Sequence, residues 1–100
     1  MYQVQIPAEV QEALRRLQAA DPAGAELVSE AVLALAADPR PAGVHVLSEA
    51  EGLHRVHLSR VDPGTGRRLQ YRVMYQVRDE NLVVLLLTAG ALPPASRRRR

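Results

Sequence analysis

Hydrophobic and polar residues recur with helical spacing from Ala8 to about Asp38. Gln3 to Ile6 alternates before this part and predicts a short first strand. From Ala8 to Ala20 the apolar residues recur every three or four positions, which predicts a helix. Asp21 and Pro22 have the chemistry of an N-cap followed by a first helical residue, and a second apolar stripe predicts a helix ending near Asp38 and Pro39. The link is so short that we expect antiparallel helices.

After the Pro- and Gly-rich segment 40–43 the period changes to that of strands. Residues 44–47 predict a short edge strand. Residues 53–61 and 67–77 alternate on either side of a turn at 62–66, which predicts a hairpin. A second tight turn at 78–81 leads into a last strand from Leu82 to Thr88, which we expect Gly90 to stop.

Apart from the short edge strand at 44–47, the order β-α-α-β-β-β predicts an α+β fold, in which a helical hairpin packs on one face of an antiparallel twisted sheet. With 100 residues the chain is long enough for one domain with one core and too short for two. We expect a single domain over residues 1–90 and a flexible Pro- and Arg-rich C-terminal tail over residues 91–100.

Composition excludes several classes of protein. There is no Cys, so the chain has no disulfide framework and no thiolate metal site. No apolar run approaches the ~20 residues of a membrane helix, and the N-terminus lacks the pattern of a signal peptide. There is no helical His pair and no carboxylate at metal-ligand spacing, which argues against a metal site. We therefore expect a soluble, cytoplasmic protein without a bound metal.

Charge is strongly segregated along the chain. All 13 basic residues are Arg, against 11 acidic residues. Residues 1–51 carry a net charge of −5, residues 52–78 carry +5, and the last four residues add +4. The basic middle segment coincides with the predicted hairpin.

Strand alternation places part of this basic charge on one face of the sheet. If the apolar faces of the hairpin meet the helices, Arg55, His57 and Arg72 converge on the exposed face, with Arg78 near them. Guanidinium groups bind phosphate oxygens through paired hydrogen bonds, so a phosphate chain would suit this face. The alternative is that these charges only keep the face soluble.

Two strings resemble a known family. They are Leu53-His54-Arg55-Val56-His57-Leu58 and Tyr71-Arg72-Val73-Met74-Tyr75-Gln76-Val77. With the Asp79-Glu80 pair and the apolar strand that follow, they resemble the RelE/ParE superfamily, the toxins of bacterial type II toxin–antitoxin systems, over roughly residues 2–90. The match is closest to the RelE branch. It implies a RelE-like fold, a cognate antitoxin as partner, and ribosome-dependent endonuclease activity on messenger RNA, which inhibits translation. The family needs no metal and no cofactor, since the ribose 2′-hydroxyl attacks the adjacent phosphate.

The resemblance also implies roles for particular residues. Arg72 matches the family's Arg at the scissile phosphate, while Arg55 and His57 match two basic positions on the neighbouring strand. These three are the candidate catalytic residues: Arg72 would stabilise the transition state, His57 would accept a proton, and Arg55 would position the RNA backbone. Further RNA-binding residues are expected among the other arginines of the basic segment: Arg60, Arg67, Arg68 and Arg78.

The chain departs from the family's pattern after Gly90. Leu92 stands where an Arg is expected, and the terminal Tyr or His of active RelE-like toxins is missing. This departure implies attenuated cleavage. It leaves two alternatives open: a ParE-like inhibitor of DNA gyrase that cleaves nothing, or a module that retains only antitoxin binding. The Arg97–Arg100 tail could partly replace the missing charge.

Overall fold

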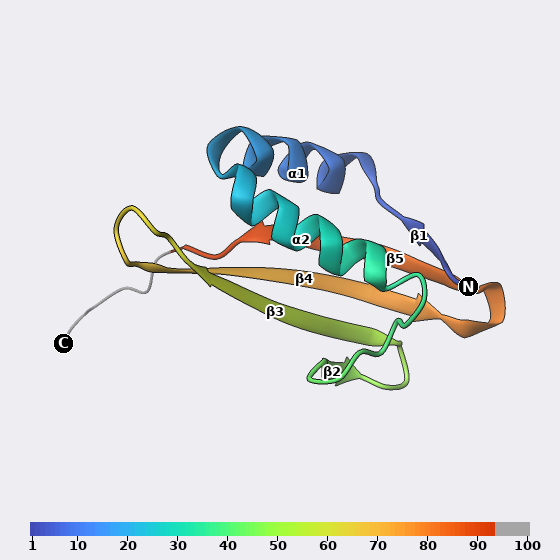
Figure 1. Cartoon of the computed structure of the whole chain (residues 1–100). Coiled ribbons are helices and arrows are strands. Elements are labelled where there is room, and N and C mark those ends of the chain that lie inside the picture. The colour runs from blue at the N-terminus through green and yellow to red at the C-terminus, as the bar shows by residue number, and fades with distance from the viewer. Residues whose placement is uncertain (94–100) are drawn as a thin grey trace.

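In the computed structural model, which describes residues 1–93, two helices pack on one face of a five-stranded sheet (Figure 1). The elements are β1 (Gln3–Gln5), α1 (Ala8–Ala20), α2 (Pro22–Ala34), β2 (His45–Ser48), β3 (Leu53–Val61), β4 (Arg68–Arg78) and β5 (Val83–Ala91). A single 3-10 turn, η1 (Asp79–Asn81), connects β4 to β5. The predicted α+β fold is confirmed.

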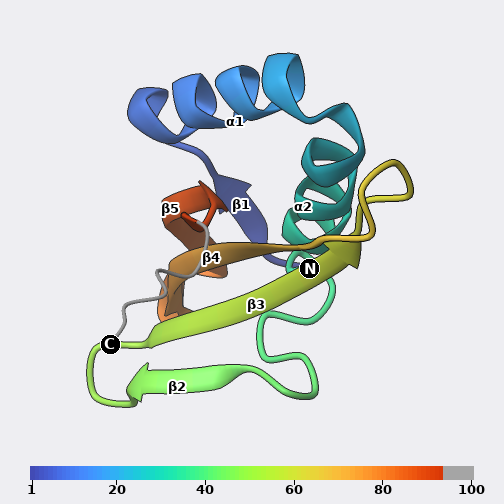
Figure 2. The same ribbon diagram turned by 90° about the vertical axis from the view of Figure 1, so that its left-hand side faces the viewer.

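The strands lie in the order β1-β5-β4-β3-β2, so β4 is central and β2 forms an edge far from α1 (Figure 2). The β3–β4 hairpin is the longest regular pairing, running from Leu53 opposite Gln76 to Val61 opposite Arg68. The pairing of β4 with β5 is interrupted by a bulge between Met74 and Tyr75. The register of the β3–β4 pairing is uninterrupted, so each residue of β3 has a defined partner on β4. This pairing positions the site described below.

The core lies between the helices and the sheet, and two tyrosines supply its largest side chains. Tyr71 and Tyr75 are fully buried on β4. Because a buried hydroxyl needs a partner, each reaches a polar group beside the helices. Tyr75 Oη donates to the Pro39 carbonyl at 2.8 Å, and burial raises the pKa of Tyr75 to about 12. The hydroxyl therefore stays a donor at any ordinary pH.

Tyr71 belongs to a polar cluster at the α1–α2 turn, which we name the Asp21 cluster: Asp21, Arg60 and Tyr71. Tyr71 Oη donates to the Asp21 carboxylate, and Arg60 pairs with the same carboxylate at 2.6 Å. Asp21 also caps α2 by accepting the Gly24 amide at 3.0 Å. These bonds hold the pKa of Asp21 below its usual range, with the Tyr71 hydroxyl as the largest cause. The cluster ties the helical hairpin to the far end of the β3–β4 hairpin.

The structure corrects three details of the sequence prediction. The sheet is mixed, because β1 pairs in parallel with β5 while the other pairings are antiparallel. Periodicity gives the spacing of a strand but not the direction of its partner. Helix α2 ends at Ala34, short of Asp38, and turns follow it. The last strand passes through Gly90 to Ala91, and the Leu92 amide still donates to the Gln70 carbonyl at 2.9 Å.

The predicted C-terminal tail, including Arg97–Arg100, lies mostly outside the described residues. Within residues 1–93, the structure has no helix long and apolar enough to cross a membrane.

Candidate nucleic-acid interface

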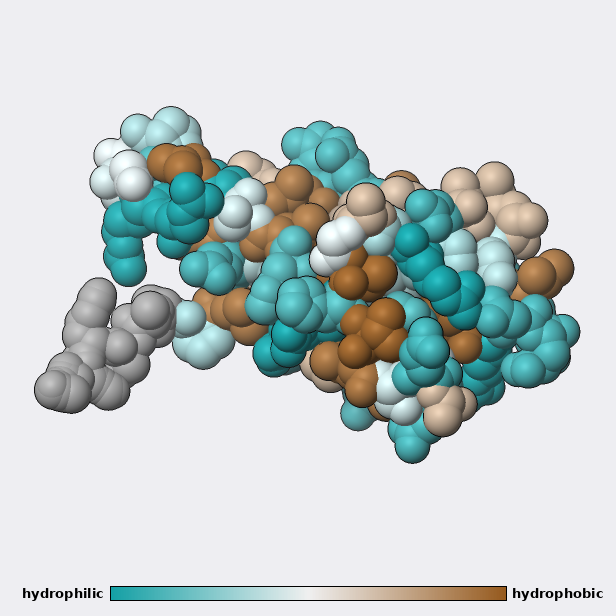
Figure 3. Space-filling model, turned by 90° about the horizontal axis from the view of Figure 1, so that it is seen from below, coloured by the Kyte–Doolittle hydropathy of each residue, from teal (hydrophilic) through white to brown (hydrophobic). Residues whose placement is uncertain are grey.

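The face of the sheet opposite the helices carries basic side chains and no acidic ones. We call it the open face. It includes His45 on β2, Arg55, His57 and Ser59 on β3, Arg68, Gln70, Arg72, Met74, Gln76 and Arg78 on β4, and Thr88 and Gly90 on β5, together with the apolar residues Val61, Val83 and Leu85. None of the five strands contains an Asp or a Glu. Seen from below, this side of the molecule is largely hydrophilic with smaller hydrophobic patches (Figure 3).

Arg72 and His57 form the centre of the open face because they are directly opposite residues in the β3–β4 register. Opposite side chains on one face of an antiparallel pair have Cβ atoms about 5 Å apart. Arg55 lies two residues from His57 on the same face of β3. The three candidate catalytic residues are thus brought together, as strand alternation predicts.

Arg55 and Arg72 differ from Arg40 and Arg60 in whether an acidic side chain pairs with them. Arg40 pairs with Asp79 at 2.7 Å and Arg60 pairs with Asp21 at 2.6 Å, so their charges are compensated within the fold. Arg55 and Arg72 have no ion pair in the described part of the chain, and Arg55 Nε is buried without a hydrogen bond. Neighbouring like charges repel unless water or an anion compensates them. The centre of the open face therefore favours an anionic ligand.

A small hollow of about 150 Å³ adjoins Arg72 and is lined by β5 and the residues after it. Gly90 lies opposite Arg72, and a Cβ added at Gly90 would meet nothing within 4 Å. Leu92 also lines the hollow. The hollow beside Arg72 is therefore open to a ligand, and Leu92 contributes no charge to it.

The four other predicted RNA-binding arginines divide between the two faces. Arg68 and Arg78 lie on the open face at opposite ends of β4, about 33 Å apart along an extended strand. The Arg68 guanidinium donates to Ser59 Oγ at 3.1 Å, and Arg78 Nε donates to the Gln76 side chain at 3.0 Å. Both therefore keep their charge on the open face without an ion pair among residues 1–93.

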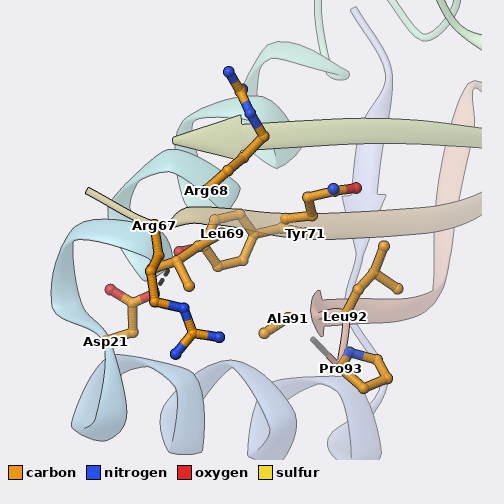
Figure 4. A pocket seen from close by; sticks show the side chains of 9 residues that line it. Asp21, Arg67, Arg68, Leu69, Tyr71, Ala91, Leu92 and Pro93 are labelled. Atoms are coloured by element: carbon orange, nitrogen blue, oxygen red, sulfur yellow. Dashed lines mark hydrogen bonds between the residues drawn. The ribbon is translucent and has the colours of Figure 1, made fainter. Parts of the chain in front are cut away.

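Arg60 and Arg67 do not share this face. Arg60 points to the helix side, where it belongs to the Asp21 cluster, so its charge is already compensated. Arg67 lies in the β3–β4 connection and lines a cavity of about 290 Å³ with Asp21, Tyr71 and Leu92. Arg68 also borders this cavity, but its side chain extends away from the others (Figure 4). The basic segment 52–78 contains six arginines, and the directions of their side chains decide which of them share the open face.

One residue of the open face was missed in the sequence. His45 on the edge strand β2 is opposite Arg55, and its ring centroid lies 6.4 Å from that of His57. The signal that could have found it is the pairing of β2 with β3, which periodicity alone does not give. The third histidine, His54, is buried on the helix side, where it stacks on Tyr75 and its Nδ1 bonds the Gly52 carbonyl. In residues 1–93 no three His, Asp or Glu side chains are grouped to hold a metal ion.

Comparison with known structures identifies the fold. The isolated E. coli RelE toxin matches with a TM-score of 0.67 and 18% sequence identity, covering 95% of this chain and 88% of that chain. RelE in the intact E. coli RelBE toxin-antitoxin complex matches with a TM-score of 0.65 and 19% identity, covering 93% and 99%. A mutant E. coli RelE in complex with an antitoxin RelBc peptide matches with a TM-score of 0.61 and 18% identity, covering 92% and 84%.

No family model and no curated protein sequence matches the chain. The structural matches cover nearly the whole domain, and they confirm the RelE-like fold that the two sequence strings predict. The chain has the fold of the RelE toxins.

Proposed function

We propose that this protein is the toxin of a type II toxin–antitoxin pair and that it cleaves messenger RNA on the ribosome. The observation that carries the proposal is the uncompensated Arg72 beside His57 and Arg55 on an acid-free face. The RelE-like fold supports it, because the neighbours of known structure are described as toxins and as toxin-antitoxin complexes.

The chemistry of these side chains suits cleavage of RNA without a cofactor. A guanidinium is always charged and can bind two phosphate oxygens, so Arg72 would stabilise the negative charge that grows on the phosphorus centre. An imidazole has an ordinary pKa of about 6.5 and can accept a proton near neutral pH, which a guanidinium cannot. His57 would therefore take the proton from the ribose 2′-hydroxyl as it attacks the phosphate.

The remaining basic residues of the open face would hold the RNA backbone. Arg55 lies beside His57, and Arg68 and Arg78 lie toward the ends of β4. Contacts from such residues to phosphates position a nucleic acid without reading its sequence. We expect the scissile phosphate at Arg72 and the flanking nucleotides along β4. The 2′-hydroxyl restricts the reaction to RNA.

The same face would be neutralised by an antitoxin in the cytoplasm. Because the open face lacks carboxylates, an acidic segment of a partner would compensate Arg55 and Arg72 and exclude RNA. The antitoxin seen with E. coli RelE gives this partner class its support. The absence of a charged residue at Leu92 supports a slower enzyme than its relatives.

The test is to add purified protein to ribosomes translating a defined message and map new RNA ends by primer extension. We expect cuts at discrete positions that require the ribosome and disappear when the product of a neighbouring small reading frame is added. Intact messages would contradict the proposal. A parallel gyrase supercoiling assay would then show whether the protein is a ParE-like inhibitor, and growth after expression alone would identify a module that only binds antitoxin.

A further inference from the structure

His45 and His57 lie on neighbouring strands of the open face with their ring centroids 6.4 Å apart and their planes tilted by 52°. Both side chains are exposed. His45 pairs in register with Arg55, and His57 pairs with Arg72. Two imidazoles and two guanidiniums therefore form one group of four side chains across β2, β3 and β4.

Cleavage by the 2′-hydroxyl requires two proton transfers. The 2′-oxygen loses a proton as it forms a bond to phosphorus, and the 5′-oxygen gains one as its bond to phosphorus breaks. Arg55 and Arg72 can do neither, since a guanidinium is not deprotonated in proteins. If His57 accepts the first proton, a second group with an ordinary pKa near neutrality must supply the other.

His45 is the group on the described open face that can supply that proton. The other titratable side chains near the sheet are placed elsewhere: His54, Tyr71 and Tyr75 are buried on the helix side. Tyr2 donates to Asp79 at 2.6 Å, away from the centre of the face. The titratable and charged groups that face His45 are Arg55 and His57 from β3, with Arg72 behind them on β4.

We infer that His45 is a second catalytic residue, which protonates the 5′-oxygen leaving group while His57 accepts the 2′-hydroxyl proton. This inference rests on the proposed function. The 2′-oxygen–phosphorus bond forms, the phosphorus–5′-oxygen bond breaks, and the products are a 2′,3′-cyclic phosphate and a 5′-hydroxyl. The proton gained by His57 and the one lost by His45 exchange with water, so no further reactant is needed. A separation of 6.4 Å lets the two rings flank one phosphodiester.

The experiment measures single-turnover cleavage of a ribosome-bound message between about pH 5 and 8, the range in which imidazoles titrate. The wild type should give a bell-shaped profile. His45→Gln should lower the rate roughly 100-fold and remove the fall in rate at high pH, because that fall reports loss of the acid's proton. His57→Gln should instead remove the fall at low pH. Val46→Gln, a neighbour on β2 that is half exposed, is the matched control and should leave the rate unchanged.

A message with sulfur in place of the scissile 5′-oxygen provides the second readout. Because a thiolate leaves without protonation, this message should restore His45→Gln to nearly the wild-type rate and should not rescue His57→Gln. A merely structural role of His45 would not give selective rescue. If the wild type cuts but His45→Gln keeps both pH limbs or is not rescued, the role of His45 is wrong and the proposed function stands. If the wild type cuts no message, both fall.

Discussion

Replacing Arg72 with alanine is expected to lower the rate of ribosome-dependent cleavage by roughly 10²- to 10³-fold, the usual loss when one donor to a developing anionic charge is removed. Arg72 is half-buried at the centre of the open face, opposite His57, and it adjoins the hollow next to Gly90. Its charge is not compensated by an acid within residues 1–93. Removing the Arg72 side chain therefore breaks no ion pair of the described fold, and we expect the loss to appear in the cleavage rate. The measurement is the single-turnover rate at saturating protein.

Two variants on the same strand make this expectation specific. Arg72→Lys keeps the charge but loses the planar, paired donors, so it should recover only part of the rate. Arg78→Ala removes an exposed arginine six residues along β4 and should weaken binding of the message with little effect on the saturated rate. An Arg72→Ala protein that is folded and cleaves as fast as the wild type would remove Arg72 from the catalytic group.

Replacing Gly24 with alanine is expected to destabilise the fold by about 1–3 kcal/mol, the usual range for overpacking a close-packed site. In an exposed helix interior the same change stabilises by about 1 kcal/mol, so the expected sign is reversed. The reason is that a Cβ at Gly24 would overlap both the Tyr71 hydroxyl and the Asp21 carboxylate. The Asp21 cluster would have to separate, or α2 would have to move off the sheet. Urea unfolding followed by circular dichroism measures the change.

Gly64 provides the control for this substitution. A Cβ at Gly64 would make one ordinary contact, at 3.8 Å from Asp62 Oδ1, so Gly64→Ala should change stability by no more than about 0.5 kcal/mol. The penalty of Gly24→Ala should also shrink when Tyr71 is replaced by Phe, because the overlapping hydroxyl is then absent. If Gly24→Ala stabilises the protein as in an ordinary helix, the packing described for the Asp21 cluster is wrong.

The element order and the face of each hairpin residue could be predicted from the sequence because both depend on local periodicity. Strand alternation placed Tyr71 inward and Arg72 outward, and the burial of β4 alternates in that way. The parallel pairing of β1 with β5 could not be predicted, since it depends on where the chain returns after two helices. The end of α2 was also missed, because apolar residues continue past Ala34, where the backbone amides of residues 35–37 donate to carbonyls three residues back instead of four.

The three central residues of the candidate site were predicted from the sequence, whereas His45 was missed and Arg60 was wrongly included. Arg55, His57 and Arg72 lie together because two adjacent strands of one hairpin carry them. His45 joins them through pairing with a separate strand, which the sequence does not encode locally. Arg60 was grouped with the RNA-binding arginines by charge alone, whereas alternation along β3 puts it beside Leu58 on the helix side, within reach of Asp21.

A message with a single 2′-deoxynucleotide tests the central claim most directly. The deoxy residue is placed immediately 5′ to a mapped cleavage position and the message is bound to ribosomes with the protein. We predict that the all-ribose message is cut there to leave a 2′,3′-cyclic phosphate and a 5′-hydroxyl, while the deoxy message stays intact at that bond. Cutting of the deoxy message, or an all-ribose message that is never cut, would contradict the account of the open face as a metal-free RNA-cleaving site.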